Sequence, residues 1–326
     1  MKDNVATRSR LGSVVLLATL LILLPGISFG EITVDRVVFP VTLSDGNDYS
    51  VVGYLYREGN GAHRDGTLQV LIHGASYDHR YWDVPSFNDH DYSYARFMAK
   101  NGFPVLAIDL LGAGESSRPQ GDFLNMAETA SSIHQVLASV RTSHHGKLAL
   151  VGHSNGSILS VFVQATYHDA DALVLTGWEH TAHPFPFDPA ALAPLFQFPY
   201  ITIPDFVRGF LLYYPPGADP AVMAYDLSYL STTISRGQFG DLFGVLTFPV
   251  TDRVADVTGP VLVALADQDL IAPAVFAAAE AGFFGHASSV TVRTLANTGH
   301  AFNLHLSNQT GWTLIRDWLR DGVEED

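Results

Sequence analysis

Ser154 lies in the pentapeptide GHSNG (residues 152–156), and Asp269 and His300 follow it along the chain. A hydroxyl, an imidazole and a carboxylate together supply nucleophilic catalysis, because the imidazole takes the serine proton while the carboxylate orients the imidazole. Gly-x-Ser-x-Gly alone is a weak signal, since short patterns occur by chance. The elements around the serine must therefore decide whether it is a nucleophile or part of a turn.

The flanking residues place this serine between a strand and a helix. Residues 148–151 form a short apolar run typical of a buried strand, and apolar residues recur at helical spacing over residues 158–163. A strand, Gly-x-Ser-x-Gly and a helix in this order form a nucleophile elbow. Side chains at the glycine positions would collide with neighbouring elements, and the serine must adopt a strained backbone conformation that projects its hydroxyl above the sheet. This context favours a nucleophile.

Four further segments accompany the elbow: LIHGASYDHRYW (71–82), AIDLLGAGESSRP (107–119), VLVALADQDLIAP (261–273) and LANTGHAFNLHL (295–306). With these segments the sequence resembles the α/β-hydrolase superfamily over about residues 33–320, apart from an insertion described below. The resemblance implies an α/β fold in which helices flank a mostly parallel central sheet. It also implies the chain order Ser154, Asp269, His300 for the catalytic residues.

The resemblance assigns roles to individual residues. Ser154 would be the nucleophile, His300 the general base and acid, and Asp269 the carboxylate that fixes the imidazole tautomer. The backbone N–H groups of Ala75 and Asn155 would form the oxyanion hole, the latter at the start of a helix whose dipole favours negative charge. We expect the substrate to contact Gly74, Tyr77, Trp178 and Phe185.

Three residues compete for the role of the acid. In the family pattern the acid stands four residues before a proline, which selects Asp269, before Pro273. Glu179 follows the sixth predicted core strand, where some relatives carry the acid instead, and Asp267 is expected to shape the turn. Ala266 stands where the family usually has glycine, a departure that loosens the match at this turn.

Serine as the nucleophile excludes the dehalogenase and epoxide-hydrolase branches of the superfamily, which use aspartate at that position. An acyl-enzyme suits carboxylic esters, thioesters and lactones, and it needs no cofactor. We therefore expect hydrolysis of a small-molecule ester with a medium-sized hydrophobic acyl or aryl group. C–C bond hydrolysis or cofactor-free peroxidation by the same triad is an alternative. A non-catalytic binding module on a hydrolase scaffold is another, although no triad member is missing.

The rest of the chain predicts how the core is built. An N-terminal strand pair turns at residues 44–48, and later strands alternate with helices, among them one expected over residues 272–284. Nearly continuous apolar strands indicate a parallel sheet covered on both faces. These strands are expected at residues 68–74, 103–112, 148–151, 170–178, 259–267 and 288–296.

One segment interrupts that alternation. Between Trp178 and Gly259 the sequence is rich in proline and aromatic residues, lacks a strand of the parallel type, and is too long for a structureless loop. We predict a helical cap at residues 181–256, inserted after the sixth core strand. The hydrolase core would then comprise residues 31–180 and 257–326.

Residues 1–30 have the layout of a secretory signal peptide. Three basic residues lie within the first ten, the apolar run VVLLATLLILLP follows at 14–25, and small residues stand at 28 and 30. The apolar run is shorter than the ~20 residues that a spanning helix needs. We expect cleavage near Gly30/Glu31, a secreted or periplasmic protein, and no stable membrane anchor after cleavage.

The composition bounds the partners. The formal net charge is −15, and removing residues 1–30 takes away three positive charges and one negative charge, leaving about −17. An acidic surface argues against nucleic acid and anionic membranes as partners. The chain has no cysteine, so its core must hold it together. The pairs His144-His145 and His180-x-x-His183 lack a neighbouring carboxylate cluster, and we expect no metal site.

Overall fold

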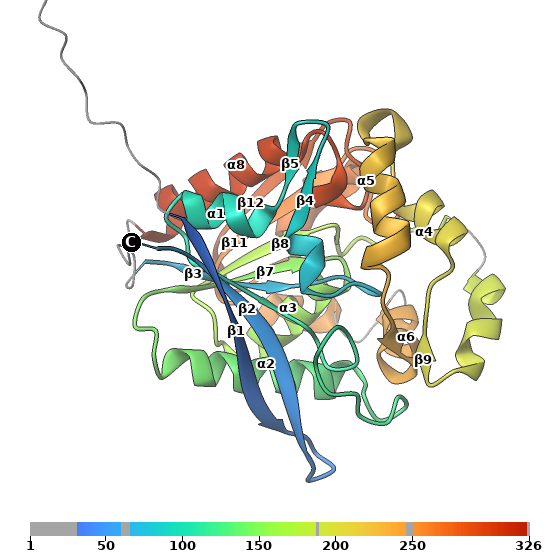
Figure 1. The fold of residues 1–326 in the computed structure, drawn as a ribbon, viewed down its shortest axis with the longest axis horizontal. Coiled ribbons are helices and arrows are strands. Elements are labelled where there is room, and N and C mark those ends of the chain that lie inside the picture. The colour runs from blue at the N-terminus through green and yellow to red at the C-terminus, as the bar shows by residue number, and fades with distance from the viewer. Residues whose placement is uncertain (1–30, 60–65, 187–188, 246–250, 325–326) are drawn as a thin grey trace, which may run out of the picture.

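The computed structural model describes residues 31–59, 66–186, 189–245 and 251–324. The predicted signal peptide, residues 1–30, lies outside these ranges. Of the predicted cleavage site Gly30/Glu31, only Glu31 is described. Eight strands form the central sheet in the spatial order β1-β2-β6-β3-β7-β8-β11-β12 (Figure 1). Their bounds are β1 Ile32–Thr42, β2 Asp48–Glu58, β3 Leu68–Ile72, β6 Val105–Ile108, β7 Leu148–His153, β8 Ala172–Thr176, β11 Gly259–Ala266 and β12 Ala287–Leu295.

The sheet is mostly parallel, as the sequence predicts. Strands β1, β2 and β6 pair antiparallel, whereas every pairing from β6 across to β12 is parallel. Every residue of β3, β6, β7 and β8 is buried, because helices cover both faces of these central strands. Most residues of the edge strands β1 and β12 are exposed or half-buried.

Helices α2 (Met126–Arg141) and α3 (Asn155–Tyr167) cover one face of the sheet, and α1 (Tyr94–Lys100) and α8 (Asn308–Leu319) cover the other (Figure 1). The period of two along a strand divides the core accordingly. Val70 and Ile72 of β3 pack in the cluster with α2 and α3, while Leu71 packs in the cluster with α1 and α8. Strand β3 thus contributes side chains to the apolar cores on both faces of the sheet.

Two local predictions need correction. The helix expected over residues 272–284 is three short turns: η6 (Ala274–Phe276), α7 (Ala277–Glu280) and η7 (Ala281–Phe283). Gly282 disfavours a continuous helix, and the buried Glu280 turns inward to His180. The sequence reading also omitted a hairpin of β4 (Val84–Phe87) and β5 (His90–Tyr92). Its turn has positive φ at Asn88 and Asp89, residue types that tolerate this conformation.

The insertion after β8, the sixth core strand, contains helices and one small antiparallel strand pair. Figure 1 shows α4, α5 and α6 grouped together beside the sheet. Val207, Leu211 and Phe239 belong to a small apolar cluster within this segment. Its elements are η2 Pro189–Gln197, β9 Tyr200–Ile201, α4 Asp205–Leu212, η3 Pro215–Gly217, α5 Pro220–Tyr225, η4 Asp226–Leu230, β10 Ile234–Ser235, α6 Arg236–Val245 and η5 Thr251–Asp256.

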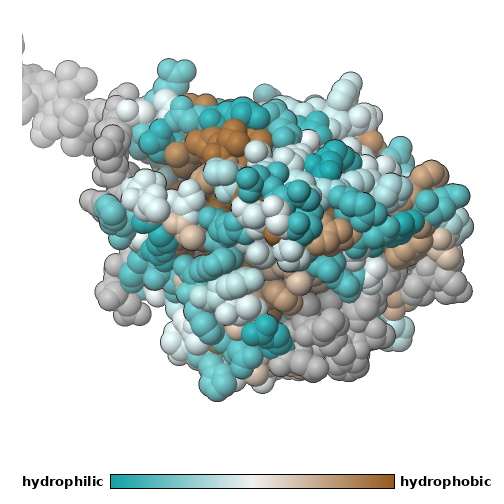
Figure 2. All heavy atoms as spheres, turned by 90° about the horizontal axis from the view of Figure 1, so that it is seen from below, coloured by the Kyte–Doolittle hydropathy of each residue, from teal (hydrophilic) through white to brown (hydrophobic). Residues whose placement is uncertain are grey.

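The surface in Figure 2 is mostly hydrophilic. Viewed from below Figure 1, it shows a few hydrophobic patches between polar residues. None of the helices in the described part of the chain combines the length and the apolar character needed to span a bilayer.

Candidate active site

Ser154 sits in a sharp turn between β7 and α3. Its φ of 54° and ψ of −122° lie in a region that a residue with a side chain rarely adopts, and its N–H donates to the carbonyl of Thr176 at 2.8 Å. A Cβ at Gly152 would lie 2.6 Å from the Gly156 oxygen, and a Cβ at Gly156 would lie 2.1 Å from the Ile72 oxygen. Both glycines are therefore required for this turn.

Asp269 and His300 form a buried pair. The Nδ1 atom of His300 lies 2.8 Å from Oδ2 of Asp269, and the two side chains are 2% and 0% exposed. The other carboxylate oxygen of Asp269 accepts the N–H groups of Ile271 and Ala272 at 2.7 and 3.0 Å. Because an ionised carboxylate only accepts hydrogen bonds, the proton of a neutral His300 sits on Nδ1, which leaves Nε2 with a lone pair.

The structure brings Ser154 and His300 to the same cavity. This cavity has a volume of about 90 Å³, and Gly74, Ala75, Tyr77, Trp178 and Phe185 also line it. All of the predicted substrate contacts therefore surround one hollow. The insertion supplies much of the wall, through Phe185, Leu192, Ile203, Val207, Arg208, Leu211, Leu212, Phe239 and Leu242.

The two predicted oxyanion donors flank the serine from different elements. Asn155 is the first residue of α3, and Ala75 follows β3 in a loop so close that a Cβ at Gly74 would lie 3.2 Å from the Ser154 Cβ. In the described part of the chain, no hydrogen bond engages the N–H of Ala75 or of Asn155. Both donors are thus available beside the serine.

The competing acids face elsewhere. Glu179 accepts the Thr181 N–H at 2.6 Å and lies 3.1 Å from Nε2 of His183; its burial raises its pKa. Asp267 accepts the N–H of Thr298 at 3.2 Å and so ties the turn that carries His300. Of the three candidates, Asp269 is the one that the structure places against His300.

The other singled-out histidines have separate partners. Nδ1 of His180 lies 2.6 Å from Glu280, with both side chains fully buried, and Nε2 of His144 lies 3.1 Å from the Lys147 carbonyl.

A separate group of side chains, Asp78, His79 and Asp109, has the composition of a metal site. One carboxylate oxygen or imidazole nitrogen from each of these residues lies within 4.8 Å of those of the other two. In that group, Asp109 accepts backbone N–H groups of His79 and Glu115, and Asp78 binds Arg80. These carboxylates thereby fix the two loops after β3 and β6.

Sequence reasoning missed His153, although it occupies the x position of the elbow motif. Its ring stacks on Tyr81 at 4.7 Å and lies 5.0 Å from the ring of His300. Burial, with a smaller contribution from His300, holds the pKa of His153 well below its ordinary value. His153 is therefore a neutral ring packed against Tyr81 and His300.

Two more missed groups come from the insertion. Arg208 on α4 is 1% exposed and reaches Ser76, next to Ala75, with a hydrogen bond to Oγ of 2.6 Å. Gln238 on α6 accepts a hydrogen bond from Nδ2 of Asn155 at 2.9 Å and donates to Oγ1 of Thr129. The signal for Arg208 was its charge within the apolar run at residues 206–214, but its partner could not be read from the sequence.

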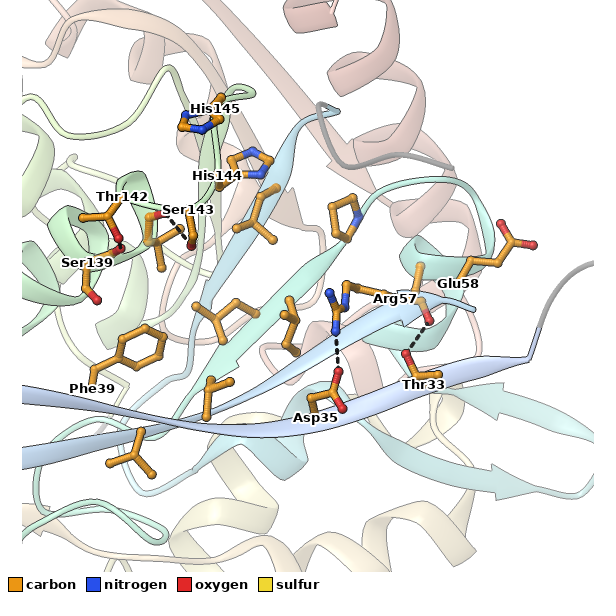
Figure 3. Close-up of a pocket in the computed structure, with 18 of the residues that line it drawn as sticks. Thr33, Asp35, Phe39, Arg57, Glu58, Ser139, Thr142, Ser143, His144 and His145 are labelled. Atoms are coloured by element: carbon orange, nitrogen blue, oxygen red, sulfur yellow. Dashed lines mark hydrogen bonds and ion pairs between the residues drawn. The ribbon is translucent and has the colours of Figure 1, made fainter. Parts of the chain in front are cut away.

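A second hollow lies at the edge of the sheet under β1 and β2 (Figure 3). It has a volume of about 1080 Å³, and its lining includes Phe39, His144 and His145. Asp35 and Arg57 form an ion pair across the two strands at 2.5 Å, with side chains 51% and 48% exposed. None of the predicted site residues lines this groove.

A strained serine after β7, a buried carboxylate–histidine pair after β11 and β12, and this strand order together define an α/β hydrolase. The sequence model of the Alpha/beta hydrolase family matches residues 69–310, which is more than half of the chain. The protein belongs to this family. A comparison with curated protein sequences gave no significant match.

Solved structures share the fold at low sequence identity. An esterase from Thermogutta terrifontis is 21% identical with a TM-score of 0.63, and the alignment covers 88% of this chain and 98% of that one. A monoacylglycerol lipase from Paleococcus ferrophilus is 17% identical, with a TM-score of 0.61 and coverages of 88% and 98%. An enol-lactonase from Burkholderia xenovorans is 14% identical, with a TM-score of 0.62 and coverages of 86% and 100%.

Proposed function

We propose that the protein hydrolyses carboxylic esters of an apolar acyl group through an acyl-enzyme on Ser154. One observation carries the proposal: the strained Ser154 and the His300 of a buried His300–Asp269 pair open onto the same apolar cavity. A serine with a paired histidine at one cavity is the arrangement that acyl transfer requires.

The chemistry follows from the atoms at the site. Nε2 of His300 takes the Ser154 proton as Oγ attacks the ester carbonyl, and the imidazolium then protonates the leaving alcohol. Asp269 keeps the imidazole oriented and supports its positive charge. The N–H groups of Ala75 and Asn155 stabilise the tetrahedral oxyanion, and a water activated by His300 releases the acid.

The cavity size narrows the substrate. A cavity of ~150 Å³ holds a benzene molecule, whereas this one measures about 90 Å³. In the described conformation it fits a short acyl chain. The medium-sized acyl or aryl group expected from the sequence would need side chains of the insertion to move. The three structural neighbours described above are an esterase, a lipase and a lactonase, which supports an oxygen ester as the bond cleaved.

Turnover of p-nitrophenyl esters, combined with labelling by a serine-directed phosphonate, tests the proposal. We expect hydrolysis of the acetyl ester and a single mass adduct on Ser154. Ser154→Ala should lower kcat by about 10⁴-fold or more and abolish the adduct while the protein stays folded. Ser160→Ala is the matched control, since this buried hydroxyl on α3, the helix that follows Ser154, bonds only the Gly156 carbonyl among the described residues.

Three results would contradict the proposal. The first is near-normal turnover by Ser154→Ala, and the second is an adduct on another residue. The third is a parent protein that cleaves no ester but hydrolyses a C–C bond or performs cofactor-free peroxidation, which would reassign the reaction while keeping the same three residues.

A further inference from the structure

The loop after β3 has an unfavourable backbone that its surroundings must maintain. It carries Ala75, whose N–H is the proposed oxyanion donor, and the next residue, Ser76, has a φ of +58°. A positive φ at a residue with a side chain persists only where neighbouring contacts enforce it. The contacts to Ser76 and Tyr77 therefore decide where the Ala75 N–H points.

Several of these contacts come from the insertion. Arg208 donates from Nη1 to the Ser76 hydroxyl at 2.6 Å and to the Ser76 carbonyl at 3.3 Å. The N–H of Thr232 donates to the same carbonyl at 2.9 Å, and the Thr232 hydroxyl donates to the Tyr77 carbonyl at 2.8 Å. Both peptide carbonyls that follow Ala75 are thus held by residues far away in the sequence.

The charge of Arg208 is balanced by Asp226, and that pair also converges on the loop. Nη2 of Arg208 lies 2.5 Å from Oδ1 of Asp226, with side chains 1% and 0% exposed. Oδ2 of Asp226 accepts the hydroxyls of Tyr77 at 3.2 Å and Tyr213 at 2.9 Å. The guanidinium also lies 4.5 Å from the centre of the Tyr77 ring.

Two simpler explanations of the pair fit these contacts less well. Arg208 lines the cavity, but its bond to Asp226 already neutralises its charge, so it is not a free cation for an anionic substrate. A buried ion pair is also a poor source of stability, because desolvation offsets the attraction. What the pair achieves is geometric: the planar guanidinium fork spans Asp226 and Ser76 at once.

We propose that Arg208 and Asp226 are positioning residues that hold the loop after β3 in the conformation in which the Ala75 N–H donates to the oxyanion. This inference rests on the proposed esterase function. It means that the oxyanion hole is complete only while α4 and η4 are packed on this loop. Neither residue takes part in proton transfer.

Arg208→Lys tests the inference with little risk to folding, because lysine keeps the charge beside Asp226 but cannot form the fork. Complete removal of one oxyanion donor costs about 10²–10³ in kcat. Arg208→Lys displaces the Ala75 N–H without removing it, so we expect a smaller loss of kcat, of at least about 10-fold. The KM for the acetyl ester should change less than about 3-fold, since the affected N–H group acts on the oxyanion, which forms only after the substrate has bound. The kcat is normalised to the fraction of Ser154 that the phosphonate labels, which removes any unfolded protein from the comparison.

Arg236→Lys is the matched control. Arg236 also links the insertion to the core, through an ion pair with Asp122 and a bond to the Phe196 carbonyl, but among the described residues no hydrogen bond or ion pair joins it to residues 74–77. This variant should keep the parental kcat. An apolar double variant, Arg208→Met with Asp226→Leu, should lose kcat as Arg208→Lys does, without leaving a buried charge unpaired.

Amide hydrogen exchange of residues 74–77 supplies a readout that does not depend on activity. We expect faster exchange in Arg208→Lys and the parental rate in Arg236→Lys. Unchanged kcat in Arg208→Lys overturns the inference, whether or not exchange rises, because the pair would then not position a catalytic donor. A parent protein without ester turnover and without an adduct on Ser154 instead signals failure of the proposed function, and the positioning role falls with it.

Discussion

The two hollows of this protein differ in size and in the state of their polar groups. The groove under β1 and β2 has about 1080 Å³, and the ion pair of Asp35 and Arg57 beside it is half exposed. The cavity at the carboxyl ends of the parallel strands has about 90 Å³, yet it joins a strained Ser154 to a fully buried His300–Asp269 pair. The smaller hollow is the one that contains the proposed active site.

This difference shows what a site of this class requires. Polar groups fixed in a water-excluded environment interact more strongly and need no reorganisation when charge develops. An exposed ion pair gains about 0–1 kcal/mol and leaves its side chains free to move. Burial and fixed orientation, rather than volume, therefore distinguish the candidate active site from the groove.

Among variants that keep Ser154, the largest expected effect is at the acid. Asp269→Asn should lower kcat by about 10³–10⁴-fold, because an amide that donates toward Nδ1 stabilises the wrong tautomer of His300. Glu179→Gln is the matched control, since Glu179 is also buried but binds Thr181 and His183. Steady-state kinetics on the acetyl ester checks both variants. If Glu179→Gln were the more damaging change, the acid would be Glu179.

Burial around the site should also make stability depend on pH. Desolvation lowers the pKa of His73, His153 and His305 in the folded protein. Below pH ~6.5 the unfolded chain binds protons that the folded chain resists, so the free energy of unfolding decreases as the pH falls. Each such histidine contributes up to ~1.4 kcal/mol per pH unit.

Urea unfolding at about pH 7.5, 6.5 and 5.5 measures this slope. The variant His153→Gln should reduce the slope by the share of one histidine. His145→Gln is the control, because His145 is an exposed side chain that lines the groove. In this variant the dependence of the free energy of unfolding on pH should stay as in the parent protein. An unchanged slope in His153→Gln would mean that this ring is not the neutral, buried group described above.

Specificity should respond to the wall of the small cavity. Leu211→Ala, on the inner face of α4, enlarges a hollow of about 90 Å³. The ratio of kcat/KM for a hexanoyl ester to that for an acetyl ester should rise about 10-fold, as expected for ~1–3 kcal/mol per contact group. Phe206→Ala, on the outer face of the same helix and 80% exposed, is the control. Equal ratios in both variants would argue against acyl binding in this cavity.

The smallest effect is expected in the groove. Arg57→Ala removes the exposed ion pair with Asp35 and should change the free energy of unfolding by less than ~1 kcal/mol. It should leave kcat/KM for the acetyl ester unchanged. A loss of activity comparable to that of Asp269→Asn would show that the groove takes part in function.

The features that could be predicted from the sequence are the local ones. The buried strands, the elbow at Ser154 and the turn before Pro273 each depend on a few consecutive residues, and the structure contains all of them. The pairing of His300 with Asp269 needed the family order as well, because 31 residues separate them. The resemblance to the family supplied this order of catalytic residues, which the spacing of the residues alone could not supply.

The features that could not be predicted depend on contacts between distant segments. Arg208 and Ser76 are 132 residues apart, and no local pattern marks Ser76 as a partner of a cation. The aromatic residues of the insertion predict a medium-sized acyl group, which stays a prediction; the cavity measures about 90 Å³, and Phe198, Phe206, Phe210 and Tyr229 are exposed rather than part of its wall. The composition of the insertion predicts that the wall of the cavity is apolar, but it does not predict the size of the cavity.

The hydrogen bonds from Arg208 and Thr232 to the loop after β3 have a consequence for building chimeric enzymes. An insertion after the sixth strand looks like a module that could be exchanged between hydrolases to transfer specificity. In this protein such an exchange would also remove the residues that hold Ser76 and Tyr77. A graft of a foreign insertion should therefore carry its own version of residues 74–77, so that recombination crosses over before β3 ends rather than at Thr176.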